Sequence, residues 1–321
     1  MTILLRRCGP LLALLLASAA AAQTYPAKPI RVVVPYAVGG ATDVVLRIVA
    51  PRWGEYLGQQ VVVDNRPGGG SVIGLDLVAK SAPDGYTVGV ANIAFGANPS
   101  LLSKLPYDTE KDFVPVSLVT TVPMVLAVHP SVPARSVKDL IAVAKAKPGS
   151  LSFASAGNAS ANHLANELFD YLAGVKMVHV PYKGGGPAVI AIVSGEVAVL
   201  FATIPSSLQH FKSGRLHGLA ISTANRNSTL PEIPTIAESG LPGYEAFDWQ
   251  GIVLPAGTPG AIGLRLQKEL ARALAQPEVH ERMVANGAEV VGSTAEELSA
   301  HFKKEFSKWS KVIKEAGIRL D

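Results

Sequence analysis

The chain has 321 residues, of which 48% are hydrophobic, and its formal net charge is +4. This length and composition allow one large domain or two of ordinary size, each with a substantial core. Basic and acidic residues are interspersed, and no basic run with interleaved aromatic residues occurs, so nucleic-acid binding is not expected.

Residues 1–22 have the features of a secretory signal peptide. Two arginines precede the apolar run Leu11–Leu16, and small residues at Ala20 and Ala22 suit cleavage by signal peptidase. We therefore expect a mature chain that begins at Gln23, in the periplasm. Its formal charge would be +2.

The single cysteine, Cys8, lies within this leader. The mature protein is therefore expected to have no disulfide and no thiol chemistry. No later segment contains the roughly 18 consecutive apolar residues of a membrane span.

The segment Ile30–Asp43 predicts a buried strand, a tight loop at Gly39-Gly40 and the start of a helix. The N-terminus of such a helix carries unpaired amides and the positive end of the dipole, which favour an anion. Many turns of this form bind nothing, so one loop does not establish a site. Thr42 or Asp43 could cap the helix, or Asp43 could accept from a ligand. A kink or break is expected near Pro51.

Strand-like and helix-like segments then alternate, which predicts a mainly parallel sheet with helices on both faces. Ligands of such sheets lie beyond the carboxyl ends of the strands, where Asn92 follows one predicted strand. Two strand-like runs, 113–119 and 122–128, are expected to cross into a second domain. Three helices, over 261–275, 277–286 and 294–316, are expected to end the chain.

The opening pattern recurs in the second half of the chain. The strand 151–154 leads into the small-residue loop Ser155–Ser160 and an amphipathic helix over 161–172. Further on, Thr203 begins a helix with a proline in its first turn. If the two loops faced each other, their amides and hydroxyls could hold a carboxylate without any arginine.

A serine hydrolase is the main alternative, with Ser155 or Ser160 beside His163. The spacing of Ser160 and His163 is also that of a helix N-cap and its third residue, and the chain has no Gly-x-Ser-x-Gly elbow. No catalytic residue is therefore assigned, and the protein is expected not to be an enzyme.

No metal and no cofactor are expected. The histidines lack metal-ligand spacing, and the triple glycines 68–70 and 184–186 match no nucleotide-binding signature and are interpreted as turns. Three aromatic residues could wall a pocket or simply fill the core: Phe95, Phe201 and Trp249.

Motifs in sequence order also carry a family resemblance. They are Tyr25–Pro35, Gly39–Asp43, Val63–Gly68, Pro83–Thr87, Ser155–Asn158 with His163-Leu164, Val180–Gly184 with Gly186–Ala188, Leu230–Thr235, Glu238–Gly243, Trp249 with Gly251, and Pro255–Pro259. Together they resemble the periplasmic receptors of tripartite tricarboxylate transporters, the Bug receptor family. The chain differs from the family pattern at Ala159 and at Ala202-Thr203, in the distal half of the expected pocket.

The resemblance implies an α/β, two-lobed periplasmic binding protein of the Venus-flytrap type II class, each lobe a mainly parallel sheet flanked by helices. The implied organisation is a signal peptide at 1–22, a first lobe at 23–125 and 249–321, and a second lobe at 126–248. The implied function is capture of a small carboxylate or dicarboxylate and its delivery, by a monomer, to membrane permease subunits. A ligand sensor for a signalling system remains the alternative.

The expected ligand-binding residues come from both loops and from the ends of neighbouring strands. They are Tyr36, Ala37, Val38, Gly39, Gly40, Thr42, Asp43, Asn92, Phe95, Ser155, Ala156, Gly157, Asn158, Ala159, Ser160, His163 and Thr203.

Overall fold

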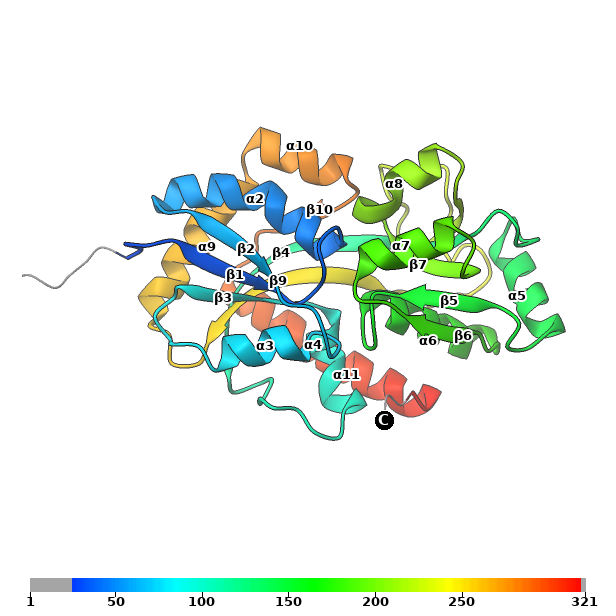
Figure 1. Ribbon diagram of the computed structural model, residues 1–321, viewed down its shortest axis with the longest axis horizontal. Helices are drawn as coiled ribbons and strands as arrows, with labels where there is room; N and C mark the ends of the chain where they lie inside the picture. The colour runs from blue at the N-terminus through cyan, green and yellow to red at the C-terminus, as the bar shows by residue number, and fades with distance from the viewer. Residues whose placement is uncertain (1–24, 319–321) are drawn as a thin grey trace, which may run out of the picture.

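The computed structural model describes residues 25–318, so the predicted leader lies outside the described residues (Figure 1). Within this range ten strands form one continuous sheet flanked by helices. The strands are β1 (Ile30–Val34), β2 (Val61–Asn65), β3 (Thr87–Ala91), β4 (Phe113–Val128), β5 (Ser152–Ser155), β6 (Val178–Pro181), β7 (Val199–Thr203), β8 (His217–Ile221), β9 (Phe247–Pro255) and β10 (Glu289–Val290). The helices are α2 (Ala41–Leu57), α3 (Val72–Ala79), α4 (Ile93–Leu101), α5 (Val137–Ala146), α6 (Ala161–Ala173), α7 (Gly185–Val193), α8 (Ile204–Lys212), α9 (Gly260–Leu274), α10 (Pro277–Ala285) and α11 (Ala295–Ala316).

Two long strands, β4 and β9, join the two halves of the molecule (Figure 1). Residues 113–123 of β4 pair with β9, and residues 124–128 pair with β7 and β8. The two strand-like runs seen in the sequence are thus parts of one strand, because the threonines between them also suit an extended backbone. We call the part built on β1, β2, β3 and β10 the first lobe and the part built on β5 to β8 the second lobe.

The outer strands of each lobe are parallel, whereas β4 and β9 run antiparallel to their neighbours. The sheet is therefore mixed, with a parallel set in each lobe. Strand β1 ends at the loop that precedes α2, and β5 ends at the loop that precedes α6. This arrangement places the carboxyl ends of both parallel sets at the boundary between the lobes.

Helix α2 differs from the sequence prediction at two places. It continues through Pro51 without a break, and its N-cap is Gly40 rather than Thr42 or Asp43. Pro51 lies on the exposed side of the helix, where solvent can satisfy the carbonyl group that lacks a helical partner. The Asp43 carboxylate still reaches back toward the helix start, since it accepts a hydrogen bond from the Gly39 amide at 3.0 Å.

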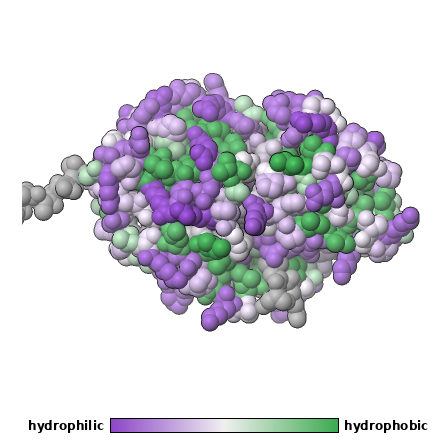
Figure 2. Space-filling view, in the orientation of Figure 1, coloured by the Kyte–Doolittle hydropathy of each residue, from purple (hydrophilic) through white to green (hydrophobic). Residues whose placement is uncertain are grey.

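The hydrophobic core contains three fully buried tryptophans, Trp53, Trp249 and Trp309. The indole groups of Trp249 and Trp309 both donate to Glu305 Oε2, at 2.9 and 3.0 Å, and so connect α11 to β9. On the face shown in Figure 2, apolar patches are interrupted by hydrophilic residues. None of the helices within residues 25–318 is long and apolar enough to span a bilayer.

Candidate functional site

A small cavity of about 30 Å³ lies between the two lobes. Its volume suits one or two water molecules, or the oxygens of one carboxylate, since about 10–15 Å³ of such space holds a water. Its lining residues come from loops and helix ends of both lobes: Tyr36, Gly40, Ala41, Thr42, Asn92, Ala156, Ser160, Ala161, Asn162, Gly185, Thr203 and Asp248.

Five helices begin at this cavity. The N-cap residues of α2, α4, α6 and α8, which are Gly40, Asn92, Ser160 and Thr203, line it, as does Gly185, the first residue of α7. Each start presents backbone amides and the positive end of a helix dipole. The cavity therefore favours an anion, although no lysine or arginine is among the described residues that line it.

Three side chains that line the cavity have buried polar atoms without a hydrogen-bond partner in the described part of the chain. They are the hydroxyl groups of Tyr36 and Ser160 and the Oδ1 atom of Asp248. Buried polar atoms in folded proteins are normally paired, so these three indicate a place for water or a polar ligand. Burial raises the pKa of Tyr36 above its usual value and that of Asp248 to about 7.

A second cavity of about 370 Å³ shares Tyr36 and Ala156 with the first as lining residues. It could hold the remainder of a ligand whose carboxylate lies among the helix ends. Its lining is Pro35, Tyr36, Pro67, Gly68, Gly69, Gly70, Ser71, Asn98, Leu102, Ala156, Gly157, Asn158, Ala159, Pro181, Tyr182 and Lys183.

Glycines allow the lobes to touch beside these cavities. A Cβ atom on Gly184, where φ is +128°, would come within 2.8 Å of the Ala37 Cβ. A Cβ atom on Gly70, where φ is +60°, would come within 2.5 Å of the carbonyl oxygen of Asn158. The two lobes are thus in direct contact beside both cavities.

Ser155 and His163 lie behind the second-lobe loop rather than on the cavity. The Ser155 hydroxyl is fully buried and lies 2.6 Å from Nε2 of His179. The His163 ring stacks on His179, with 4.1 Å between ring centroids, and its Nδ1 accepts from the Ala159 amide at 3.3 Å. Burial lowers the pKa of His163 to about 3 and that of His179 to about 4. These residues support the loop that lines the cavities.

Asp43 is 2% exposed and has internal partners on both carboxylate oxygens. Oδ2 accepts from the Gly39 amide, and Oδ1 accepts from Arg47 Nε at 2.9 Å and Asn65 Nδ2 at 3.0 Å. Through these hydrogen bonds the Asp43 carboxylate stabilises the conformation of the first-lobe loop.

The structure brings ten of the seventeen expected site residues to the two cavities and places seven elsewhere. The small cavity includes Tyr36, Gly40, Thr42, Asn92, Ala156, Ser160 and Thr203, and the larger one adds Gly157, Asn158 and Ala159. Ala37, Gly39, Asp43, Ser155 and His163 lie in or behind the loops, Val38 is 62% exposed, and Phe95 packs in the core against Phe113 and Phe302.

Sequence reasoning missed Asp248, Asn162 and Gly185. Asp248 lies between Phe247 and Trp249 at the start of β9. A single acidic residue in an otherwise mostly apolar strand was the sequence signal that could have identified it as a site residue. Asn162 Oδ1 accepts from the Ala156 amide at 3.3 Å, and its amide group donates to the Phe201 carbonyl. Gly185 belongs to the triple glycine interpreted as a turn, which instead starts α7.

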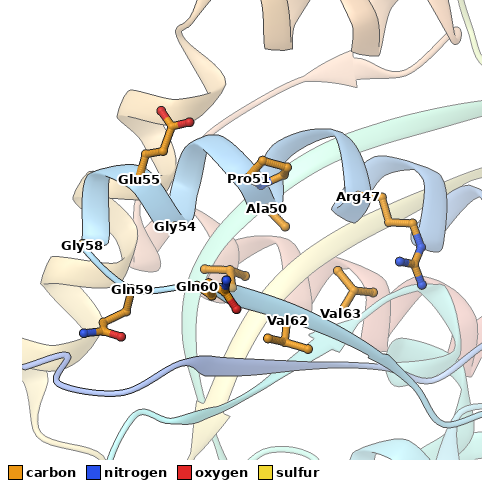
Figure 3. A pocket seen from close by; sticks show the side chains of 11 residues that line it. Arg47, Ala50, Pro51, Gly54, Glu55, Gly58, Gln59, Gln60, Val62 and Val63 are labelled. Carbon is orange, nitrogen blue, oxygen red and sulfur yellow. The ribbon is translucent and has the colours of Figure 1, made fainter.

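A larger cavity, about 550 Å³, lies outside the lobe boundary (Figure 3). It lies between α2 and the edge strand β2, where Ala50, Pro51 and Val62 contribute to its walls. Both elements belong to the first lobe, and the buried unpartnered groups described above lie elsewhere. Among residues 25–318 no cluster of three or more metal-binding side chains occurs.

Comparison with known proteins gives a consistent result. Residues 45–318 match the family model described as the tripartite tricarboxylate transporter family receptor. The chain is 40% identical over 309 residues to Protein BugT of Bordetella pertussis, covering 95% of this chain and 94% of BugT.

Three solved structures are also similar. The periplasmic binding protein BugD is 35% identical with a TM-score of 0.88, over 92% of this chain and all of BugD. Rpa4515 of R. palustris, solved with adipate, is 36% identical with a TM-score of 0.89, over 92% of this chain and all of Rpa4515. MatC of Rhodopseudomonas palustris, solved with bound malate, is 32% identical with a TM-score of 0.87, over 90% of this chain and all of MatC.

The likeness covers nearly the whole described chain, both lobes included. The protein is therefore a solute-binding protein rather than an enzyme, and it belongs to the tripartite tricarboxylate transporter receptor family.

Proposed function

We propose that this protein is a periplasmic receptor that captures a small organic acid between its lobes and delivers it to a membrane permease. The observation that carries the proposal is the convergence of five helix starts on one interlobe cavity with unpartnered hydroxyl groups. One carboxylate would lie there, held by backbone amides and by the Ser160 hydroxyl group.

The expected energies are sufficient for such binding. One helix terminus contributes about 0.3–1 kcal/mol toward an anion, and up to about 2 kcal/mol when partly buried. Charge-assisted hydrogen bonds add about 1.5–3 kcal/mol each. Several helix starts acting together can therefore replace an arginine, and the adipate and malate bound by the two relatives support a carboxylate ligand.

Ligand entry requires the lobes to separate, because they touch at Gly70 and Gly184. The strands β4 and β9 connect the lobes and are the expected hinge. An acid that contacts both lobes binds the closed state better than the open one and shifts the population toward it. The closed receptor would then be the form that the permease recognises.

A thermal-shift screen of mono-, di- and tricarboxylates and acidic amino acids tests ligand binding directly. The proposal predicts that at least one acid raises the unfolding midpoint, binds with a stoichiometry of one by calorimetry and is recovered unchanged. The absence of binding by every acid, or turnover of an acid, would contradict it.

Delivery and export require separate tests. Cells that carry the receptor with its permease subunits should take up the bound acid, and cells that lack the receptor should not. N-terminal sequencing of the exported protein should begin at Gln23, and light scattering should give the mass of a monomer. Normal uptake without the receptor would favour a sensing role.

A further inference from the structure

Asp248 differs from the rest of the small cavity in its charge. Among the described residues it is the one charged side chain in the lining, and it is 6% exposed. Its Oδ2 atom accepts from Gln250 Nε2 at 3.0 Å, and the backbone amides of Trp249 and Ile93 also favour the charged carboxylate, whereas Oδ1 makes no hydrogen bond of good geometry within residues 25–318. A buried carboxylate oxygen of this kind needs a hydrogen-bond donor, because leaving it unpaired is costly.

Hydrogen bonds from residues outside the cavity lining fix the orientation of the Asp248 carboxylate. Thr120 on β4 donates to Gln250 Oε1 at 2.5 Å, which leaves the amide group of Gln250 as the donor to Asp248 Oδ2. The three side chains are buried and belong to the two strands that join the lobes. Oδ1 is therefore the carboxylate oxygen left for a ligand.

We propose that Asp248 determines ligand specificity by accepting a hydrogen bond from a hydroxyl or ammonium group that the bound acid carries beside its carboxylate. This inference rests on the proposed function, because it assumes an acid held at the helix starts. It predicts a hydroxy or amino acid as the preferred ligand, and an unsubstituted acid as a weaker one.

The contrast with Asp43 supports a ligand role for Asp248. Both aspartates are buried near the same loops, but Asp43 has donors on both oxygens from its own chain. At Asp43 the chain thus supplies hydrogen-bond donors to both carboxylate oxygens. At Asp248 it leaves one oxygen unpaired at a cavity that also favours anions.

Tyr36 offers a second contact for the same ligand group. Its unpartnered hydroxyl is buried close enough to Asp248 that the aspartate charge contributes to the raised pKa of Tyr36. A ligand hydroxyl could donate to Asp248 and accept from Tyr36, which would satisfy both groups. A ligand ammonium would satisfy Asp248 alone or use Tyr36 as a second acceptor.

Replacing Asp248 with asparagine reverses the hydrogen-bond character of the site. The asparagine oxygen has to accept from Gln250, so its NH₂ group faces the cavity. The cavity then offers a donor in place of an acceptor. Asp170→Asn is the matched control, because Asp170 is also buried, with its pKa raised by burial to about 7, but lines a different cavity.

The experiment is calorimetry at pH 8 with pairs of acids of equal chain length: succinate with malate and aspartate, glutarate with 2-hydroxyglutarate, and adipate with 2-hydroxyadipate. The wild type and Asp170→Asn should bind one substituted acid at least about tenfold more tightly than its parent acid. Asp248→Asn should lose the preference for an ammonium-bearing acid, which cannot accept from the asparagine amide, and should weaken the preference for a hydroxy acid, because its bond is no longer charge-assisted. The tighter partner, malate or aspartate, identifies the donor as hydroxyl or ammonium.

Equal or tighter binding of the parent acid by the wild type, or an undiminished preference in Asp248→Asn, would overturn the inference and leave the proposed function standing. Failure of every acid to bind the wild type would instead contradict the proposed function itself.

Titration provides a second test if the variant does not fold. The pKa of Asp248 is raised to about 7 by burial and, to a smaller extent, by Glu305, and Tyr36 is the other titratable group beside it. Below that pH the protonated Asp248 becomes a donor. The preference of the wild type for the substituted acid should therefore shrink between pH 8 and pH 5.5, and an unchanged preference would overturn the inference.

Discussion

Gly70 of the first lobe packs against Asn158 of the second so closely that a Cβ atom on Gly70 would lie 2.5 Å from the Asn158 carbonyl oxygen. The neighbour is backbone rather than a flexible side chain, so it cannot move aside cheaply. Contact between the lobes beside the larger cavity therefore depends on the absence of a side chain at this position.

Gly70→Ala should weaken ligand binding by about tenfold or more, because the added methyl group holds the lobes apart in the state that binds the acid. Gly174→Ala is the control. Gly174 has φ of +62°, nearly the same as Gly70, but nothing lies within 4 Å of its Cβ position. Both variants carry the cost of a left-handed alanine, about 1 kcal/mol.

Thermal unfolding and calorimetry separate the two effects. The unfolding midpoints of the two variants without ligand should fall by similar amounts, and only Gly70→Ala should lose affinity. Equal affinities would mean that closure does not require this contact.

His179 should make stability depend on pH. Its folded pKa of about 4 lies below the unfolded value near 6.5, so between these values the unfolded chain binds a proton that the folded chain excludes. Its contribution to stability is complete above pH 6.5 and is lost as the pH falls. Asp170 and Asp248, whose pKa values are raised to about 7, act in the opposite sense, losing stability as the pH rises toward 7.

The difference between the wild type and His179→Gln isolates the histidine. From pH 7.5 to pH 5 the wild type should lose about 1 kcal/mol more unfolding free energy than the variant, measured by urea denaturation. This value allows for solvent screening, because the His179 side chain is only partly buried. His280→Gln, on the exposed side of α10, controls for the loss of a histidine. The same pH dependence in the wild type and His179→Gln would contradict this account.

Glu305 should be a major link between α11 and β9. Leucine at this position would leave the buried indole N–H groups of Trp249 and Trp309 unpaired, at about 1–3 kcal/mol each. Glutamine keeps a carbonyl acceptor there, so Glu305→Gln should cost less than Glu305→Leu in urea denaturation. A leucine variant at least as stable as the glutamine variant would show that the shared acceptor does not stabilise the protein.

The sequence was most informative where a local pattern decides the structure. Consecutive valines predicted β1, and small residues before amphipathic helices predicted the loops that precede α2 and α6. Such patterns depend on neighbours in the chain, so they can be recognised without knowing the tertiary structure. The family resemblance then supplied the two-lobed arrangement.

The remaining site features depend on tertiary contacts. Asp248 lines the same cavity as Tyr36 and Asn92 only because β9 returns from the second lobe beside β4. Likewise, Ser155 contacts His179 rather than His163 because β5 pairs with β6. Spacing along the sequence does not reveal such tertiary contacts, which is why Gly185, at the start of α7, and Asp248 were not predicted as parts of the site.

Gly40 tests most directly whether the acid binds at the converging helix starts. A Cβ atom there would lie 3.6 Å from both the Ala37 oxygen and the Gly185 nitrogen, an ordinary packing distance, and φ is −78°. Alanine should therefore fit. Leucine should project into a cavity of only about 30 Å³.

The decisive measurement is calorimetric titration of the wild type, Gly40→Ala and Gly40→Leu with the acid that gives the largest thermal shift. We expect one-to-one binding by the wild type and, within about fivefold, by Gly40→Ala, and at least about a hundredfold weaker binding by Gly40→Leu. The unfolding midpoint of Gly40→Leu without ligand should stay close to that of the wild type. Undiminished affinity in a folded Gly40→Leu variant would contradict the placement of the acid between the lobes.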